Sequence, residues 1–260
     1  MFVLKNRNNL MFKPLIVVVL FFCTYVQAQD LTPVTLHLVG DSTMANKPNL
    51  AYPERGWGHL LPHFVSPELE IRNYATNGRS TRSFIDEGRW SSVLSEIKEG
   101  DYVLIQFGHN DQKKEDPVRY ASPDKDYPAF LKRYIEEART KGATPMLASS
   151  ICRRHFSSDG KLERTLLEYA AAAKKVAKAE DVAFFPLNEK TCALLAETGD
   201  EESQKFFLQV PPDLYTRYPE GKIDNTHLNV IGASKVAQLF VRELKAQNHP
   251  LANYVYRETL

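Results

Sequence analysis

The chain has 260 residues, of which 43% are hydrophobic and 25% are charged, and its formal net charge is +1. This length and composition fit one globular domain with a sizeable core, and they are atypical of disordered or repeat proteins. A charge so close to zero gives no general support to a nucleic-acid-binding function.

The first 28 residues predict a signal peptide. Three cations precede an apolar run over residues 14–26, and a small residue, Ala28, stands where a signal peptidase would cut. The alternative is a membrane anchor, but a run of about a dozen residues is shorter than the ~20 that a spanning helix needs. We therefore expect residues 29–260 to reach the periplasm or the medium as one domain, free of the membrane and with a net charge of −2.

Two cysteines, Cys152 and Cys192, lie in this exported part. An oxidising compartment would allow them to form a disulfide. The alternative is a pair of buried free thiols, and the spacing along the chain does not distinguish the two arrangements.

Apolar runs of four to eight residues alternate with longer segments of helical period, which is typical of βαβ units around a parallel sheet. Five strands are predicted, over residues 35–39, 69–74, 102–107, 145–149 and 182–186. A helix is predicted over 127–138, where apolar residues recur at i, i+3, i+4 and i+7 and Gly142 follows as a stop. A last helix carries apolar residues from Val236 to Leu244. The fold class is therefore α/β.

Two polar stretches, 111–126 and 200–222, show neither a helical nor a strand period. We interpret them as loops at the rim of a site, because long loops that interrupt a regular fold are commonly functional. The segment 224–227 that follows the second stretch is also interpreted as a loop. In an open parallel sheet, ligands bind beyond the carboxyl ends of the strands.

Four short blocks at the expected strand ends carry the residue types that ester hydrolysis needs. They are Gly40-Asp41-Ser42-Thr43, Asn77-Gly78-Arg79-Ser80, Gly108-His109-Asn110-Asp111 and Asp224-Asn225-Thr226-His227. A serine can attack a carbonyl, a glycine amide and an asparagine side chain can hold the oxyanion, and an Asp/His pair can carry the proton.

Each block alone has an ordinary structural explanation. Gly-Asp-Ser suits any turn from a strand to a helix, a glycine often marks a positive φ, and a histidine before a helix is commonly a cap. Independent turns would not place all four blocks in this order at strand ends. Together they indicate a catalytic set, Ser42, Asp224 and His227, and an oxyanion hole formed by Ser42, Gly78 and Asn110.

The serine, glycine, asparagine and histidine match the four blocks of the SGNH (GDSL-like) hydrolases, and the match runs from Gly40 to His227. Within that superfamily, several phrases are similar to the rhamnogalacturonan acetylesterases: Gly40-Asp41-Ser42-Thr43-Met44-Ala45, Gly56-Trp57-Gly58, Asn77-Gly78-Arg79-Ser80-Thr81-Arg82-Ser83-Phe84, Glu87-Gly88-Arg89-Trp90 and Gln106-Phe107-Gly108-His109-Asn110-Asp111. Thr43 replaces the leucine of the eponymous tetrad, a departure that this esterase group shares.

The resemblance implies an SGNH hydrolase domain over residues 29–260, with a three-layer α/β/α sandwich of the flavodoxin type. It implies that Ser42 is the nucleophile, His227 its base and Asp224 the orienting acid. The acetyl group would pass to Ser42 and then to water, with no metal and no organic cofactor. The implied substrate is an acetylated acidic plant polysaccharide or its oligosaccharides.

Arginines and tryptophans beside the blocks favour an anionic glycan over a fatty chain. Four side chains are expected to contact the substrate: Arg79, Arg82, Trp57 and Trp90. The guanidinium groups would meet galacturonate carboxylates. The alternatives are that the arginines cap a helix or pair with Asp86 or Glu87, and that the tryptophans belong to the core.

Three other functions stay open from the sequence. A lipid or thioester hydrolase would use the same scaffold but needs an apolar channel for the acyl chain. An acetylxylan esterase would differ only in its sugar. A glycan-binding protein without activity is disfavoured by the intact set Ser42, Asp224 and His227. The sequence makes no prediction about the oligomeric state.

Overall fold

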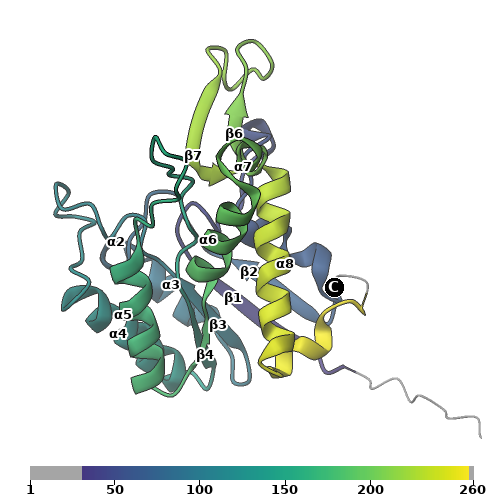
Figure 1. Cartoon of the computed structure of the whole chain (residues 1–260). Helices are drawn as coiled ribbons and strands as arrows, with labels where there is room; N and C mark the ends of the chain where they lie inside the picture. The colour runs from purple at the N-terminus through teal and green to yellow at the C-terminus, as the bar shows by residue number, and fades with distance from the viewer. Residues whose placement is uncertain (1–30, 258–260) are drawn as a thin grey trace, which may run out of the picture. The chain divides into compact units, whose positions relative to one another are not determined.

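The computed structural model describes residues 31–257, so the predicted signal peptide lies outside the described residues. The main sheet is built from five strands: β1 Val34–Gly40, β2 Leu69–Asn73, β3 Tyr102–Gln106, β4 Thr144–Ala148 and β5 Ala183–Phe185. Their order is β2-β1-β3-β4-β5, and every neighbouring pair is parallel (Figure 1). All five predicted strands are confirmed, and the order is that of the flavodoxin-like doubly wound fold.

The central strands read as continuous apolar runs because both of their faces are covered. Leu36 and Leu38 of β1 and Leu104 of β3 belong to one hydrophobic cluster, whereas Val103 and Ile105 belong to a second cluster on the opposite face. Consecutive side chains of a strand point to opposite faces, so each strand contributes to both clusters.

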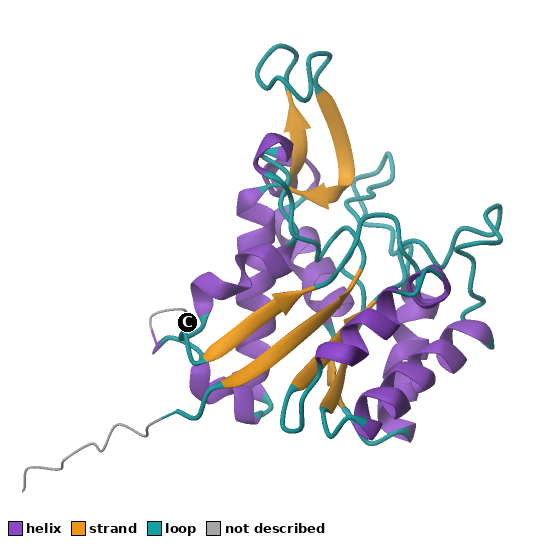
Figure 2. Ribbon diagram, turned by 180° about the vertical axis from the view of Figure 1, so that it is seen from behind, coloured by secondary structure: helices purple, strands orange, loops and turns teal. Residues whose placement is uncertain are grey.

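Helices cover both faces of the sheet (Figure 2). They are α1 Trp57–Leu60, α2 Thr81–Asp86, α3 Arg89–Glu96, α4 Asp126–Thr140, α5 Leu167–Ala179, α6 Leu187–Thr198, α7 Asp200–Ser203 and α8 Val230–Ala246. Short 3-10 helices span Asn49–Ala51, Leu61–Phe64, Gln204–Phe206 and Pro250–Tyr254. The first cluster holds residues of α1, α6 and α8, and the second holds residues of α2 to α5. The expected three-layer sandwich is confirmed.

The two predicted helices are present as α4 and α8. The helix α4 buries Tyr127, Leu131, Tyr134 and others of the expected face, and Gly142 follows it with a φ of +74°, which a glycine adopts without strain. The side chain of Asn229 caps α8 by accepting a hydrogen bond from the Gly232 N–H. Among residues 31–257, no helix has both the length and the apolar character that crossing a bilayer requires.

A second, two-stranded sheet was not predicted. The strands β6 Phe207–Val210 and β7 Lys222–Leu228 pair antiparallel, and the hairpin lies above α7 in the view of Figure 1. The prediction that segment 224–227 forms a loop was therefore wrong. Its side chains are mostly half-buried and polar, so the apolar alternation that marks a strand is missing from the sequence.

Cys152 and Cys192 form a disulfide, with Cα atoms 5.1 Å apart. The bond joins the segment after β4 to α6. This finding decides between the two arrangements that the spacing left open.

Candidate active site

Three of the four predicted blocks lie at the carboxyl ends of adjacent strands. Ser42 follows β1, Gly78 lies between β2 and α2, and Asn110 follows β3. The fourth block lies on β7, which brings Asp224 and His227 against Ser42 although 185 positions separate the serine from the histidine. The site thus forms at the edge of the sheet where open parallel sheets bind ligands.

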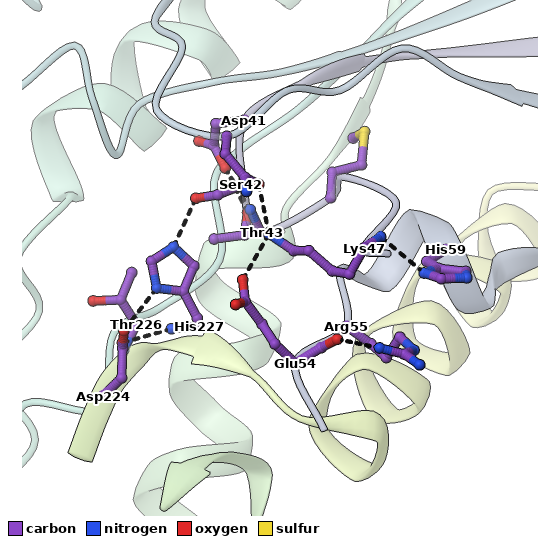
Figure 3. Close-up of polar contacts among 12 residues, drawn as sticks. Asp41, Ser42, Thr43, Lys47, Glu54, Arg55, His59, Asp224, Thr226 and His227 are labelled. Carbon is purple, nitrogen blue, oxygen red and sulfur yellow. Dashed lines mark hydrogen bonds and ion pairs between the residues drawn. The ribbon is translucent and has the colours of Figure 1, made fainter. Parts of the chain in front are cut away.

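The three side chains of the expected catalytic set form one chain of hydrogen bonds (Figure 3). Nε2 of His227 lies 2.9 Å from Oγ of Ser42, and Nδ1 of His227 lies 2.8 Å from Oδ2 of Asp224. Such an arrangement can pass a proton from the serine to the imidazole while the carboxylate holds the ring in one tautomer.

The carboxylate of Asp224 is held by its own strand. Its Oδ1 accepts hydrogen bonds from the backbone N–H groups of Thr226 at 2.8 Å and His227 at 2.9 Å. Burial opposes ionisation of Asp224, but the hydrogen bonds from the ring and backbone of His227 hold its pKa well below the usual range. Asp224 therefore stays a carboxylate in mildly acidic solution.

Asp41, beside the serine, shapes the turn. Its Oδ1 accepts from the backbone N–H of Thr43 at 2.9 Å and from the Thr43 hydroxyl at 2.8 Å, and its Oδ2 lies 3.3 Å from Nδ1 of His109. Burial would raise its pKa, but His109 and Thr43 hold it below the ordinary value. Gly40 precedes it because a Cβ there would lie only 2.7 Å from the carbonyl oxygen of Gln106.

Groups suited to an oxyanion hole are also present. Within residues 31–257, the backbone N–H groups of Ser42 and Gly78 donate to no protein acceptor. Gly78 has a φ of +77°, a conformation that favours glycine. Nδ2 of Asn110 uses one hydrogen for the carbonyl oxygen of Arg79, at 3.0 Å, which leaves its second hydrogen for a ligand.

A buried lysine next to the site escaped the sequence analysis. Nζ of Lys47 lies 2.6 Å from Oδ1 of Asn77 and 2.7 Å from Oε1 of Glu54. Figure 3 shows the Lys47–Glu54 pair beside the Ser42–His227 pair. Lys47 therefore holds the loop of Gly78, and no pattern in the sequence marks this lysine as buried.

No group of three or more His, Cys, Asp or Glu side chains within residues 31–257 is arranged to hold a metal ion.

Comparisons with known proteins agree with this geometry. Residues 38–234 match the model of the GDSL-like lipase/acylhydrolase family. The chain belongs to this family. The recognition from the four blocks and the expectation of an ester hydrolase are thereby confirmed.

Several proteins from Bacillus subtilis (strain 168) are similar to this chain. The rhamnogalacturonan acetylesterase RhgT is 39% identical over 86% of this chain and 94% of its own length. The probable rhamnogalacturonan acetylesterase YesY is 33% identical over 86% of this chain and 98% of its own length. The crystal structure of YxiM from Bacillus subtilis superposes with a TM-score of 0.71 at 27% identity, covering 85% of this chain and 58% of that one.

The two tryptophans belong to the hydrophobic core of the protein. Trp57 and Trp90 are 0% and 1% exposed. The indole N–H of Trp57 donates to Gln106 at 2.7 Å, and that of Trp90 donates to Glu137 at 2.6 Å. The expectation that they contact the substrate was wrong, since their closeness to the blocks in sequence reflects packing under the site.

The two arginines have partners within the protein. Nε of Arg79 binds Glu87 at 2.9 Å, which was one of the alternatives for this residue. Nε of Arg82 donates to the carbonyl oxygen of Tyr120 at 2.9 Å, and its guanidinium lies over the ring of Phe130 and 3.8 Å from a carboxylate oxygen of Asp126. Each side chain is 32% exposed, so its contact with a substrate carboxylate stays a prediction.

Arg154, which no sequence motif marked, anchors the hairpin that carries Asp224 and His227. It is 8% exposed, and its backbone N–H donates to the carbonyl oxygen of Asn225 at 2.9 Å. Its guanidinium donates to Oδ1 of Asn225 at 2.9 Å, to the Ser203 hydroxyl at 3.2 Å, and to the carbonyl oxygen and carboxylate of Asp200. The sequence feature that could have indicated Arg154 is the pair Arg153-Arg154, which follows the strand predicted over residues 145–149.

Arg154→Ala is expected to destabilise the protein by about 3–5 kcal/mol, because it leaves buried hydrogen-bonding groups without their charged partner. It should also lower kcat by roughly 10- to 100-fold, because a small displacement of β7 misaligns the histidine. Urea unfolding and acetate release measure the two effects. Lys205→Ala, which removes an exposed ion pair with Glu202, is the control. Full activity in a destabilised Arg154→Ala would contradict the positioning role.

Asp111 is a buried carboxyl behind the site. Its Oδ1 accepts hydrogen bonds from the backbone N–H of Thr81 at 2.9 Å and from the Thr81 hydroxyl at 2.5 Å. Its Oδ2 is buried and has no hydrogen-bond partner in the described part of the chain. Burial, reinforced by the charge of Asp41, raises the pKa of Asp111 to about 7.

The raised pKa of Asp111 predicts a pH-dependent contribution to stability. The unfolded chain loses this proton near pH ~4, whereas the folded protein keeps it up to about pH 7, so the free energy of unfolding falls as the pH rises between these values. Asp111→Asn keeps a side-chain oxygen that accepts from Thr81 but removes the titrating proton. The decline in the free energy of unfolding, on the order of a few kcal/mol, should then disappear. Urea unfolding at pH about 5 and about 8 tests it, with the exposed Asp86→Asn as control. Equal pH slopes in wild type and Asp111→Asn would refute it.

Proposed function

We propose that this chain is a carbohydrate acetylesterase that acts after export and removes O-acetyl groups from rhamnogalacturonan. The observation that carries the chemistry is the hydrogen-bonded chain from Ser42 through His227 to Asp224. The similarity to two Bacillus subtilis proteins named as an established and a probable rhamnogalacturonan acetylesterase supports the substrate.

In the proposed reaction, Ser42 attacks the acetyl carbonyl while His227 takes its proton and Asp224 stabilises the resulting imidazolium. The backbone N–H groups of Ser42 and Gly78 and the free hydrogen of Asn110 bind the oxyanion. The imidazolium then protonates the sugar oxygen as its bond to the acetyl carbon breaks, and the sugar leaves with a free hydroxyl. In the second step, His227 deprotonates a water molecule, which attacks the acetyl-serine and releases acetate.

Export is supported by two features. The N-terminal segment has the charge and apolar pattern of a signal peptide, and the Cys152–Cys192 disulfide suits an oxidising compartment. The proposal expects an exported form that begins at Gln29, which N-terminal sequencing of the protein outside the cytoplasm measures.

The substrate is tested by acetate release from a matched panel: acetylated rhamnogalacturonan, acetylated xylan, and nitrophenyl esters of acetate and of a long fatty acid. The proposal expects the highest kcat/KM on acetylated rhamnogalacturonan and negligible hydrolysis of the long-chain ester. Preference for xylan would reassign the sugar. Preference for the long-chain ester would replace the proposal by a lipid hydrolase.

Asn110→Ala should lower kcat on the order of 100-fold with little change in KM, because its amide stabilises the oxyanion mainly in the transition state. Gln112→Ala is the matched control, since it removes a side-chain amide on the same loop that binds the carbonyl oxygen of His109. Steady-state kinetics on nitrophenyl acetate measure both variants. A loss confined to KM would refute the oxyanion role of Asn110.

A further inference from the structure

Three cations gather at the rim of the site without serving the catalytic set. Lys113 and Arg119 lie on the loop between Asn110 and α4, and Arg153 follows β4. The loop is one of the two polar stretches that were predicted to form the rim. The domain as a whole carries a slight negative charge after the proposed cleavage, so this local group is not the result of a generally basic surface.

Arg119 lies over the glycine of the proposed oxyanion hole. A Cβ placed on Gly78 would lie 3.9 Å from Nη1 of Arg119. Nε of Arg119 binds Asp116 at 2.5 Å, which orients the guanidinium. Within residues 31–257, its two Nη groups have no hydrogen-bond acceptor, so they remain available to a ligand beside Gly78.

Arg153 contacts the third block. Its Nη2 donates to the carbonyl oxygen of His109 at 3.3 Å, two residues before the end of the third block. Its Nε is buried and has no acceptor in the described part of the chain. The negative charges of Asp41 and Asp224 act on it, yet neither carboxylate is within ion-pair distance. A buried donor without a protein acceptor is rare, so Nε of Arg153 remains able to donate to a ligand or to water.

Lys113 completes the group. Its backbone N–H donates to the carbonyl oxygen of Asn110 at 3.2 Å, which ties it to the site, and its ammonium group has no ion pair within residues 31–257. Partial burial and the charges of Arg119 and Arg153 lower the pKa of Lys113. Lys113 is thus close enough to both arginines for their charges to repel its own, an arrangement that a bound anion would relieve.

We propose that Lys113, Arg119 and Arg153 form a carboxylate-binding subsite beside the ester site, which holds a galacturonate residue of the substrate chain next to the acetylated sugar. The inference rests on the proposed function for its choice of ligand. Guanidinium groups match a carboxylate in a bidentate manner, and an ammonium adds a point charge. The subsite adds three cations to Arg79 and Arg82, which the sequence predicted to meet these carboxylates.

Binding is the first test, because it does not depend on catalysis. Titration calorimetry measures the affinity of a deacetylated rhamnogalacturonan oligosaccharide for wild type, Lys113→Gln and Arg119→Gln. We expect each substitution to weaken binding by about tenfold, and raising NaCl from about 0.05 M to about 0.5 M to weaken wild-type binding by a similar factor. Lys113→Arg should restore most of the affinity. Arg89→Gln, which removes an arginine already paired with Glu87, is the matched control.

Kinetics give the second readout. The kcat/KM for an acetylated galacturonan oligosaccharide is divided by that for an acetylated galactan oligosaccharide of the same length, which lacks the carboxylates. The subsite predicts that Lys113→Gln and Arg119→Gln each lower this ratio by about tenfold, whereas a merely structural role lowers both values together. Thermal unfolding within about 2 °C of wild type establishes that the variants are folded.

Three outcomes overturn the subsite: unchanged oligosaccharide affinity in both variants, equal losses on the acidic and the neutral substrate, or binding of inorganic phosphate as tight as that of the oligosaccharide. The last result would indicate a general anion site. Failure of the proposed function is recognised separately, since a protein that hydrolyses no acetyl ester but binds the oligosaccharide through Lys113 and Arg119 keeps the subsite and loses the esterase.

Discussion

Ser42→Ala is expected to abolish ester hydrolysis, with a loss in kcat of about 10⁶-fold, because it removes the attacking oxygen and leaves the rest of the site in place. His227→Ala should cause a comparable loss. The double variant should be barely slower than either single one, since residues that act as one unit are not additive. Release of nitrophenol from nitrophenyl acetate measures all three variants.

Ser150→Ala is the matched control for the serine. Ser150 follows β4, and its hydroxyl is buried without a hydrogen-bond partner in the described chain. We expect it to keep activity close to that of wild type, because its hydroxyl takes no part in the hydrogen-bonded set of Ser42, His227 and Asp224. Independent, multiplicative losses in Ser42→Ala and His227→Ala would show that the two residues do not work together.

Asp224→Asn is expected to lower kcat by about 10⁴-fold while leaving the fold intact. An asparagine amide would donate to Nδ1 of His227, which forces the proton onto Nε2 and removes the base that Ser42 needs. Asp224 itself stays ionised from mildly acidic to alkaline pH, because its hydrogen bonds hold its pKa well below the usual range. Stopped-time acetate assays across mildly acidic to alkaline pH measure the variant.

The control for Asp224→Asn is Glu163→Gln. Glu163 and His155 form another carboxylate–histidine pair, 2.9 Å apart, but both side chains are exposed and lie outside the site. Glu163→Gln should have almost no effect on kcat. A loss of only a few fold in Asp224→Asn would show that another group orients His227.

The sheet was predictable because burial on both faces gives β1 and β3 unbroken apolar sequences. The helix α4 was predictable because one face of it is buried along its whole length. The strand β7 was not, since Asp224 to His227 are half-buried polar residues whose pairing with β6 depends on contacts outside their own segment. Apolar periodicity in a sequence reflects which residues are buried, and a partly exposed polar strand shows little such periodicity.

The hydrogen-bonded set of Ser42, His227 and Asp224 was predictable because the chemistry of ester hydrolysis restricts the residue types. The substrate contacts were not. Closeness in sequence to the blocks led to Trp57 and Trp90, which pack inward. Arg153 and Arg154 follow β4, far from the blocks in sequence, and yet they contact His109 and Asn225. Some cationic side chains have a carboxylate partner and others do not. The difference depends on residues that are distant in sequence and meet only in the folded chain.

Covalent labelling of the active serine tests the central claim most directly. The protein is incubated with a serine-directed phosphonate until esterase activity is lost, digested and mapped by mass spectrometry. The account predicts a single adduct on Ser42 that rises in proportion to the lost activity, and none in His227→Ala, where the serine lacks its base. An inactivated protein with the adduct on another residue, or full esterase activity with Ser42 completely labelled, would contradict it.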